Sequence, residues 1–123
     1  LTDRWLPWQG KTFDAAAQTG DNLFTNDGLW LARLMFPGYR GYVPDGPGRS
    51  RALQFRTYLG PGTHDPDRQV LKIDYDWDVN PRLIVRDVLD ELVQLEEGHY
   101  LGKALLRRSG RCVCAAYFAL SAT

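Results

Sequence analysis

The chain is poor in the residues that build covalent cross-links and metal sites. It has two cysteines, two histidines and one methionine. Cys112 and Cys114 are two residues apart, so on a strand they would share a face, and a disulfide between them would be strained. His64 and His99 show no metal-ligand spacing relative to the cysteines. The sequence therefore predicts two buried, unbridged thiols, with no metal and no cofactor.

The chain also lacks an excess of charge and a long apolar segment. Its 15 basic and 15 acidic residues cancel, so no overall field attracts nucleic acid or anionic lipid. We expect neither a nucleic-acid nor a membrane partner. The longest apolar run, residues 29–36, contains Arg33 and is too short to span a bilayer. No signal peptide is recognisable, and a cytoplasmic location is the default expectation.

The residues that are abundant are apolar and aromatic. Among 123 residues, 44% are hydrophobic and 12% aromatic, enough for the core of a single domain. Residues 1–28 are rich in Gly, Asp, Asn and Thr and predict an irregular arm, with one helical turn at residues 14–18. Periodicity does not distinguish a helix from a buried strand in residues 29–36, and we favour the strand.

The rest of the chain predicts a series of strands. Residues 52–59 and 69–77 alternate between apolar and polar side chains and form a natural hairpin. Residues 83–95 predict a short helix or turn followed by a strand, and Gly102 in the next segment indicates a bend or a close approach. The later strands are expected at residues 89–95, 99–107 and 112–120, with tight turns at 96–98 and 108–111.

Consecutive strands joined by short turns form an antiparallel meander. We therefore predict a mainly β fold, a small meander closed into a lipocalin-like β-barrel that spans residues 29–123. At most one or two short helices are expected. The alternative is a cone-shaped α+β sheet wrapped around a helix, if residues 29–36 and 82–92 are both helical.

Two groups of residues resemble known bacterial domains. The segment Trp8-Gln-Gly-Lys-Thr-Phe13 is similar to the W-x-G-K-x-F segment of the GXWXG domain. The companion DUF4334 domain is resembled by Asp74-Tyr-Asp, Asn80-Pro81, Arg86, Asp90-Glu-Leu-Val, Tyr100-Leu-Gly-Lys and Ala116-Tyr-Phe-Ala-Leu120. The resemblance covers about half of the chain. It implies a compact lipocalin-like β-barrel and no particular activity.

One face of the expected hairpin is polar and carries Arg56, Tyr58, Lys72 and Asp74. If this face is exposed, the four residues form cross-strand charge pairs of small energy. If it lines a barrel, they must pair with each other or bind a carboxylate, phenolate or enolate. The apolar face is the more natural interior, so we favour exposure.

The candidates for acid–base catalysis are Asp74, Glu91 and His64. On the expected strand Glu91 shares an apolar face, where burial would raise the pKa of its carboxyl group. The favoured alternative buries Asp90 instead, or pairs Glu91 with Lys103 or Arg107. His64 lies in a long loop, either at the mouth of a pocket or in an ordinary polar turn.

Three functions are compatible with the sequence. The first is binding of a small, largely apolar or aromatic organic molecule in a β-barrel pocket, because the chain is aromatic and has no catalytic signature. We assign ligand contact to Arg56, Tyr58, Lys72, Tyr75, Trp30, Tyr100 and Tyr117. The second is a cofactor-independent acid–base enzyme (isomerase, cyclase, lyase or hydrolase) that uses the same pocket. The third is a structural module that forms a homodimer through an exposed sheet face.

Overall fold

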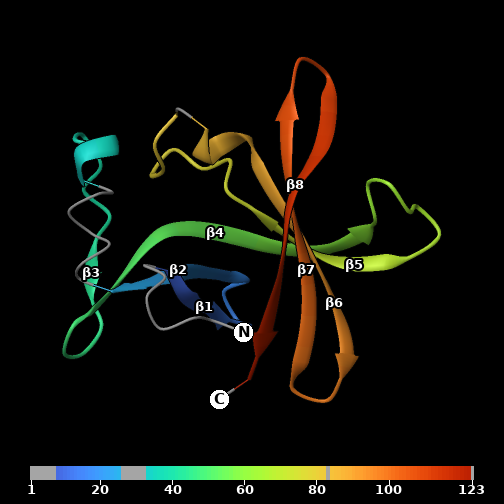
Figure 1. Cartoon of the computed structure of the whole chain (residues 1–123), viewed down its shortest axis with the longest axis horizontal. Helices are drawn as coiled ribbons and strands as arrows, with labels where there is room; N and C mark the ends of the chain where they lie inside the picture. The colour runs from blue at the N-terminus through green and yellow to red at the C-terminus, as the bar shows by residue number, and fades with distance from the viewer. Residues whose placement is uncertain (1–7, 26–32, 83, 123) are drawn as a thin grey trace.

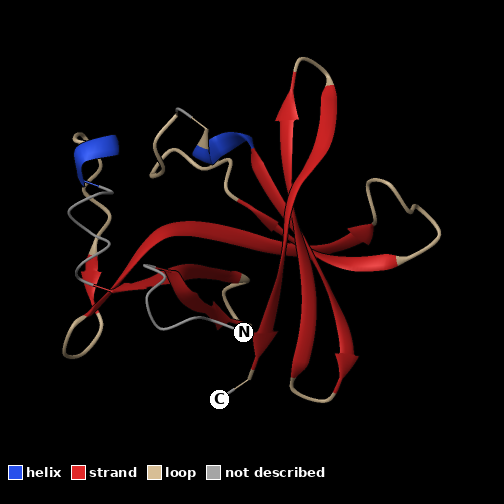
Figure 2. Cartoon of the chain, in the orientation of Figure 1, coloured by secondary structure: helices blue, strands red, loops and turns tan. Residues whose placement is uncertain are grey.

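The computed structural model describes residues 8–25, 33–82 and 84–122. They form one eight-stranded antiparallel sheet in the order β1-β2-β4-β5-β6-β7-β8, with β3 paired to β4 (Figures 1 and 2). The strands are β1 (Trp8–Asp14), β2 (Thr19–Thr25), β3 (Val43–Pro44), β4 (Arg49–Pro61), β5 (Gln69–Asp74), β6 (Val88–Glu96), β7 (His99–Arg108) and β8 (Arg111–Ser121). The 3₁₀ turn η1 (Val85–Asp87) precedes β6. Within these ranges, no helix has the length and apolar character needed to cross a bilayer.

The meander from β4 to β8 confirms the strands and turns predicted for this part of the chain. β4 and β5 pair as the predicted hairpin, with Arg56 opposite Asp74 and Tyr58 opposite Lys72. A short turn of helix leads into β6, and tight turns connect β6 to β7 and β7 to β8. The mainly β, antiparallel class is therefore correct. The sheet is not closed, because no ladder joins β1 to β8 among the described residues.

The N-terminal part differs from the prediction. Residues 8–14 and 19–25 are the strands β1 and β2, not an irregular arm, and residues 15–18 form the turn between them, not a helical turn. The alternation that would reveal β1 is interrupted by a register shift between Trp8 and Gly10. Residues 33–35 are helical, so the strand predicted for residues 29–36 is wrong there. The remaining residues of that prediction, 29–32, lie outside the described ranges.

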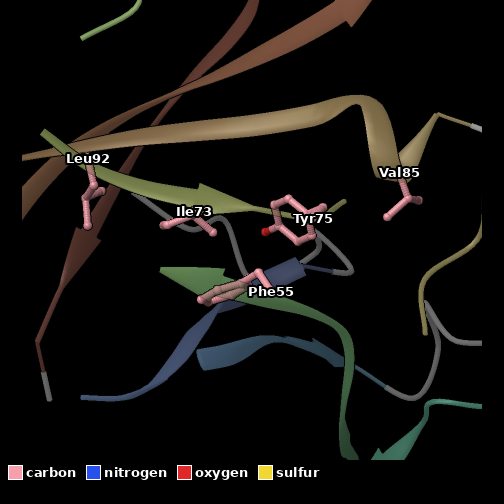
Figure 3. Packing of buried hydrophobic residues seen from close by; sticks show 5 residues of the cluster. All are labelled: Phe55, Ile73, Tyr75, Val85 and Leu92. Carbon is pink, nitrogen blue, oxygen red and sulfur yellow. The ribbon is translucent and has the colours of Figure 1, made fainter. Parts of the chain in front are cut away.

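The two faces of the sheet differ in character. The inner face carries Phe55, Ile73, Tyr75, Asp90 and Phe118, and the outer face carries Tyr58, Lys72, Glu91, Lys103 and Tyr117. The core lies on the inner face, where Phe55, Ile73, Tyr75 and Leu92 pack together with Val85 of η1 (Figure 3). The apolar face of the predicted hairpin is thus the interior, as expected.

Gly102, in the middle of β7, leaves room for an aromatic ring of the neighbouring strand. Phe118 lies opposite it on β8, and a Cβ atom at Gly102 would come within 2.3 Å of that ring. Of the two alternatives that the sequence left open for Gly102, a bend and a close approach, the structure shows a close approach, and it is made by a side chain of the sheet itself. Phe118 also packs edge to face against Trp8 of β1, with 5.9 Å between ring centroids. Side chains thus connect the two edge strands that no ladder joins.

A bulge bends β4 in its middle. Asn22 of β2 pairs with Ala52 and Gly20 pairs with Phe55, so two β4 residues, Leu53 and Gln54, face a single residue of β2. Leu53 has a φ of 56°, a left-handed conformation that is uncommon for a residue with a branched side chain. The bend lets one long strand pair with β2 through its first half and with β5 through its second half.

Candidate functional site

A lysine of β1 is buried on the inner face. The Lys11 side chain is only 4% exposed, and its Nζ lies 3.0 Å from the Asp90 carboxylate of β6. Nζ donates a second hydrogen bond to Asn22 Oδ1 at 2.9 Å and a third to the hydroxyl of Tyr75. These four residues, which we call the Lys11 network, come from β1, β2, the end of β5 and β6. All three hydrogens of the ammonium group therefore have an acceptor.

Aromatic rings surround the same ammonium group. The centroids of the Trp8, Phe55, Tyr75 and Phe118 rings lie 5.1 to 5.6 Å from Nζ, each within range for a cation–π contact. The rings exclude water, which strengthens the ion pair with Asp90. An arrangement of this type recognises ammonium ligands in other settings, but here the chain supplies its own ammonium group.

The environment shifts the pKa values of the three ionisable groups. Burial alone would lower the pKa of Lys11, but Tyr75 and Asp90 outweigh it, so the pKa is raised and the lysine is charged. Burial raises the pKa of Asp90, and the nearby Lys11 offsets this only in part. Burial likewise raises the pKa of the Tyr75 phenol. The tyrosine therefore stays protonated, and the network holds one cation against one carboxylate.

The Lys11 network joins the two halves of the sheet. Asn22 Nδ2 donates to the Leu53 carbonyl at 3.1 Å, which ties the network to the β4 bulge. Because the ammonium group is saturated and enclosed, the arrangement stabilises the fold and leaves no free group for catalysis. Among these residues, the sequence predicted ligand contact for Tyr75 and, in the favoured alternative, burial of Asp90. Lys11 stands inside the Trp8–Phe13 segment, which was the one signal that could have drawn attention to it.

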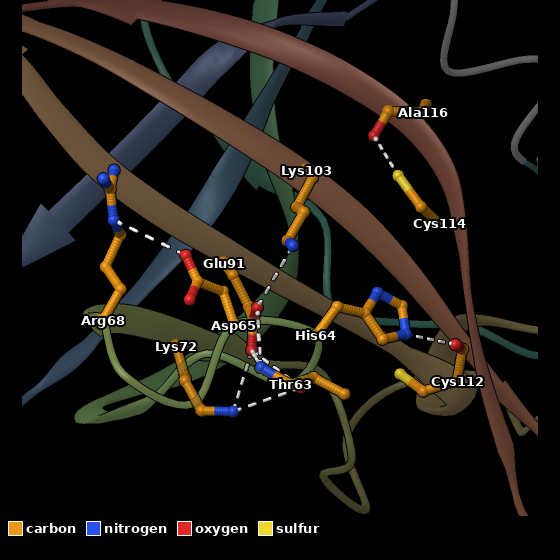
Figure 4. A network of polar contacts seen from close by, with 10 residues as sticks. All are labelled: Thr63, His64, Asp65, Arg68, Lys72, Glu91, Lys103, Cys112, Cys114 and Ala116. Carbon is orange, nitrogen blue, oxygen red and sulfur yellow. Dashed lines mark hydrogen bonds and ion pairs between the residues drawn. The ribbon is translucent and has the colours of Figure 1, made fainter.

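The predicted catalytic residue Glu91 lies on the outer face and its neighbour Asp90 on the inner face, the face assignment of the alternative that we favoured, but Glu91 at 2% exposed is as buried as Asp90 at 3%. Figure 4 shows its carboxylate bound by Lys72 Nζ at 2.8 Å and by the backbone and hydroxyl groups of Thr63. Lys103 Nζ is 3.9 Å away, which is the predicted ion pair. Burial tends to raise the pKa of Glu91, but Lys72 and Thr63 outweigh it and the pKa is lowered, contrary to the expectation of a raised value.

Asp74, the second predicted catalytic carboxylate, also has a basic partner. Arg107 Nη2 donates to Asp74 Oδ1 at 2.8 Å, and the Tyr58 hydroxyl donates to Oδ2 at 3.3 Å. Burial tends to raise the pKa of Asp74, but the hydrogen bond from Arg107 and its other partners lower it. Arg56 lies against the Trp77 ring and donates to the Asp76 carbonyl at 3.0 Å. These polar residues of the hairpin therefore pair with each other and their neighbours.

The remaining predicted residues are dispersed. His64 lies on the loop between β4 and β5, and its Nε2 is 2.7 Å from the carbonyl oxygen of Cys112 on β8. Tyr100 is partly buried against the core, whereas Tyr117 is 71% exposed on the outer face. Trp30 lies outside the described residues. Cys112 and Cys114 are unbridged, as predicted, but each is only half-buried. None of the predicted site residues that the structure describes lines the pocket between residues 36–41 and 78–82 or the smaller one beside Phe13 and Trp77.

A pocket lies between two loops, and none of the residues that line it is among the site residues predicted from the sequence. Its volume is about 590 Å³, and it lies between residues 36–41 on one side and residues 78–82 on the other. Its lining consists of Phe36, Gly38, Tyr39, Arg40, Gly41, Asp78, Val79, Asn80, Pro81 and Arg82. We call it the Tyr39–Asn80 pocket. The first of its loops belongs to the Gly- and Pro-rich segment that follows the short helix at residues 33–35.

Two buried residues of this pocket hold the β4 bulge in place. The Tyr39 hydroxyl accepts the Leu53 N–H at 2.7 Å, and Asn80 Nδ2 donates to the Gln54 carbonyl at 2.6 Å. Asn80 Nδ2 also donates to the Tyr75 carbonyl at 2.9 Å. The groups freed by the bulge are therefore paired. Asn80 Oδ1 is buried and accepts no hydrogen bond from any described residue.

Arg86 of η1 holds the second loop, residues 78–82, in place. Arg86 Nε donates to the Asn80 carbonyl at 2.9 Å, and its Nη2 donates to the Asp78 carbonyl at 2.8 Å. The pocket wall formed by residues 78–82 is thus anchored to η1, and the wall formed by residues 36–41 is anchored to β4 through Tyr39. Both walls are attached to the sheet by buried polar contacts.

The described residues include no group of three or more His, Cys, Asp or Glu side chains placed to hold a metal ion. No protein-family model, curated protein or solved structure matches the chain. The resemblance to the GXWXG and DUF4334 domains therefore stays a prediction from the sequence.

Proposed function

We propose that the protein binds a small, largely apolar or aromatic organic molecule in the Tyr39–Asn80 pocket. The observation that supports this most directly is the pocket itself, whose volume of about 590 Å³ falls in the range of small-molecule sites. Phe36, Val79 and Pro81 supply apolar wall, and Tyr39 supplies an aromatic ring. Arg40, Asp78, Asn80 and Arg82 supply polar groups, which in such sites fix the orientation of the ligand.

The buried amide of Asn80 gives further support. A buried acceptor without a partner is rare in folded proteins and usually reflects a bound water, an ion or a functional role. Asn80 lines the pocket, and its buried Oδ1 is such an acceptor. Leaving it unpaired costs about 1–3 kcal/mol, and a ligand donor that displaced the side chain enough to reach it would recover part of this.

This proposal moves the site away from the barrel interior expected from the sequence. A lipocalin-like barrel remains part of the proposal, in an incompletely closed form in which Trp8 and Phe118 bring β1 and β8 together. Its interior is filled by the core and by the Lys11 network, so the ligand occupies one end of the sheet. The acid–base alternative has less support, because Asp74 and Glu91 are each bound by a basic residue.

The test uses the neutral fluorescent probe N-phenyl-1-naphthylamine. At about 0.3 kcal/mol per non-hydrogen atom, its roughly 17 atoms give a dissociation constant on the order of 0.1 mM. We expect saturable binding with one site per chain, measured by the rise in probe fluorescence. The blocking variant is Gly38→Trp, because a Cβ atom at Gly38 meets nothing within 4 Å and the new ring has room to fill the pocket.

The matched control adds the same ring elsewhere. Val113 lies on β8, is 59% exposed and does not line the pocket, so Val113→Trp should leave probe binding unchanged. We expect Gly38→Trp to weaken binding at least tenfold while the thermal midpoint stays within a few degrees of the wild type. Equal binding by the wild type and Gly38→Trp, or no binding by the wild type, would show that the pocket is not the site.

A further inference from the structure

Resting on the proposed binding function, we infer that the Tyr39–Asn80 pocket selects organic anions. The ligand class is an apolar or aromatic body that bears a carboxylate, sulfonate or phosphate group, with the anionic group facing Arg40 and Arg82. These two arginines line the pocket from opposite loops. The anion would therefore connect the two walls.

Arg40 and Arg82 are available for such a ligand. Both are exposed residues of the pocket lining, and neither makes a hydrogen bond or ion pair with another described residue. Arg107 of the outer face, by contrast, is bound both to a carboxylate and to a backbone carbonyl. A guanidinium group with free donors in a partly enclosed site is well suited to bind a carboxylate or phosphate group in a bidentate manner.

The acidic residue of the pocket does not cancel this charge. Asp78 is the one carboxylate in the lining, and its side chain is fully exposed. Its Oδ1 lies 4.0 Å from Arg86 Nη1, so its closest charged neighbour is already a third arginine. The pocket therefore presents a net positive charge in a chain whose overall charge is zero. That local excess distinguishes the pocket from a general apolar site.

The test compares two probes with the same aromatic body. 8-Anilino-1-naphthalenesulfonate carries a sulfonate group, and N-phenyl-1-naphthylamine lacks it. We expect the wild type to bind the sulfonate about tenfold more tightly at low salt, because exposed ion pairs contribute modestly and the pocket adds partial shielding. We expect this preference to fall as NaCl is raised, while the affinity for the neutral probe changes little.

Two double variants test whether Arg40 and Arg82 cause the preference for the sulfonate probe. Arg40→Met with Arg82→Met should bring the affinity for the sulfonate down to that for the neutral probe, without weakening the neutral probe. The control combines Arg68→Met with Arg111→Met, two exposed arginines outside the pocket lining, and removes the same charge. It should retain the tenfold preference. Gly38→Trp should prevent binding of both probes.

The outcomes separate this inference from the proposed function. Binding of the neutral probe in the pocket, with no preference for the sulfonate, would refute the inference and leave the proposed function standing. A preference that survives in the Arg40 and Arg82 variant, or in Gly38→Trp, would place the anion elsewhere and also refute it. If neither probe binds the wild type, both proposals are wrong.

Discussion

Replacement of Lys11 by methionine tests the role of the buried ion pair. Methionine is unbranched and close to lysine in volume, one atom shorter, and it removes the charge and the three donors. Asn22 Oδ1 would still accept a hydrogen bond from Trp8 Nε1 at 2.9 Å. Asp90 would keep only the Tyr75 hydroxyl at 3.4 Å, so its carboxylate would be buried without a cation. The main cost of the substitution therefore falls on Asp90.

The loss of unfolding free energy in Lys11→Met can be estimated in two ways. Removing one partner of a buried ion pair typically costs about 3–5 kcal/mol. Alternatively, the stranded carboxyl group can take up a proton, which for an ordinary aspartate pKa of about 3.9 costs about 4 kcal/mol at pH 7 and about 1.5 kcal/mol at pH 5. We expect Lys11→Met to lose about 4 kcal/mol at pH 7. The loss should shrink as the pH falls, because protonation of Asp90 becomes cheaper.

Urea unfolding, monitored by tryptophan fluorescence, measures the loss of unfolding free energy at pH 7 and at pH 5. The double variant Lys11→Met with Asp90→Asn lacks the stranded charge, so it should recover most of the lost unfolding free energy. Since residue 90 can then no longer take up a proton, the remaining loss should be the same at pH 7 and at pH 5. The double variant also keeps the test informative if Lys11→Met alone does not fold at pH 7. A loss below about 1 kcal/mol at pH 7, or an equal loss at pH 5, would refute the reasoning.

Two further substitutions probe the outer face and the sheet. The pKa of Glu91 is lowered by its partners, so its contribution to stability is present above about pH 4.3 and is lost as the pH falls below that value. Glu91→Gln should lose about 1–3 kcal/mol at pH 7 in urea unfolding and flatten the acid side of the stability profile, whereas exposed Glu97→Gln should change neither. Gly102→Ala should lose about 1–3 kcal/mol in thermal unfolding through collision with the Phe118 ring, and Phe118→Leu in the same chain should restore part of it. An unchanged midpoint for Gly102→Ala would mean that the ring moves aside freely.

The C-terminal meander could be predicted because local signals agree there. Residues 71–74 alternate between apolar and polar side chains, and Gly98 and Gly110 adopt the positive φ that their tight turns require. Each strand pairs with its neighbour in sequence. On β5, period-2 alternation correctly placed Ile73 inside and Lys72 outside, whereas on β6 it grouped Glu91 with the apolar residues although Glu91 lies on the outer face.

The N-terminal half could not be predicted because its pairing is irregular and less local. The register shift in β1 removes the alternation that would have placed Lys11 on the inner face. A lysine in a polar segment is normally exposed, and what buries this one is a carboxylate on β6 and an aromatic ring on β8. The pocket was missed for a similar reason, since its two walls are loops without periodicity.

The two buried polar systems of the molecule meet at one residue. The Tyr75 hydroxyl belongs to the Lys11 network, and the Tyr75 carbonyl accepts a hydrogen bond from Asn80 in the pocket floor. Asn80 in turn holds the Gln54 carbonyl of the β4 bulge, which Asn22 of the network also supports through Leu53. The bulge is strained and persists only because its surroundings determine it from both sides. The pocket and the ion pair thus share Tyr75 and the bulge as supports, and a ligand that binds only the folded pocket stabilises the whole sheet.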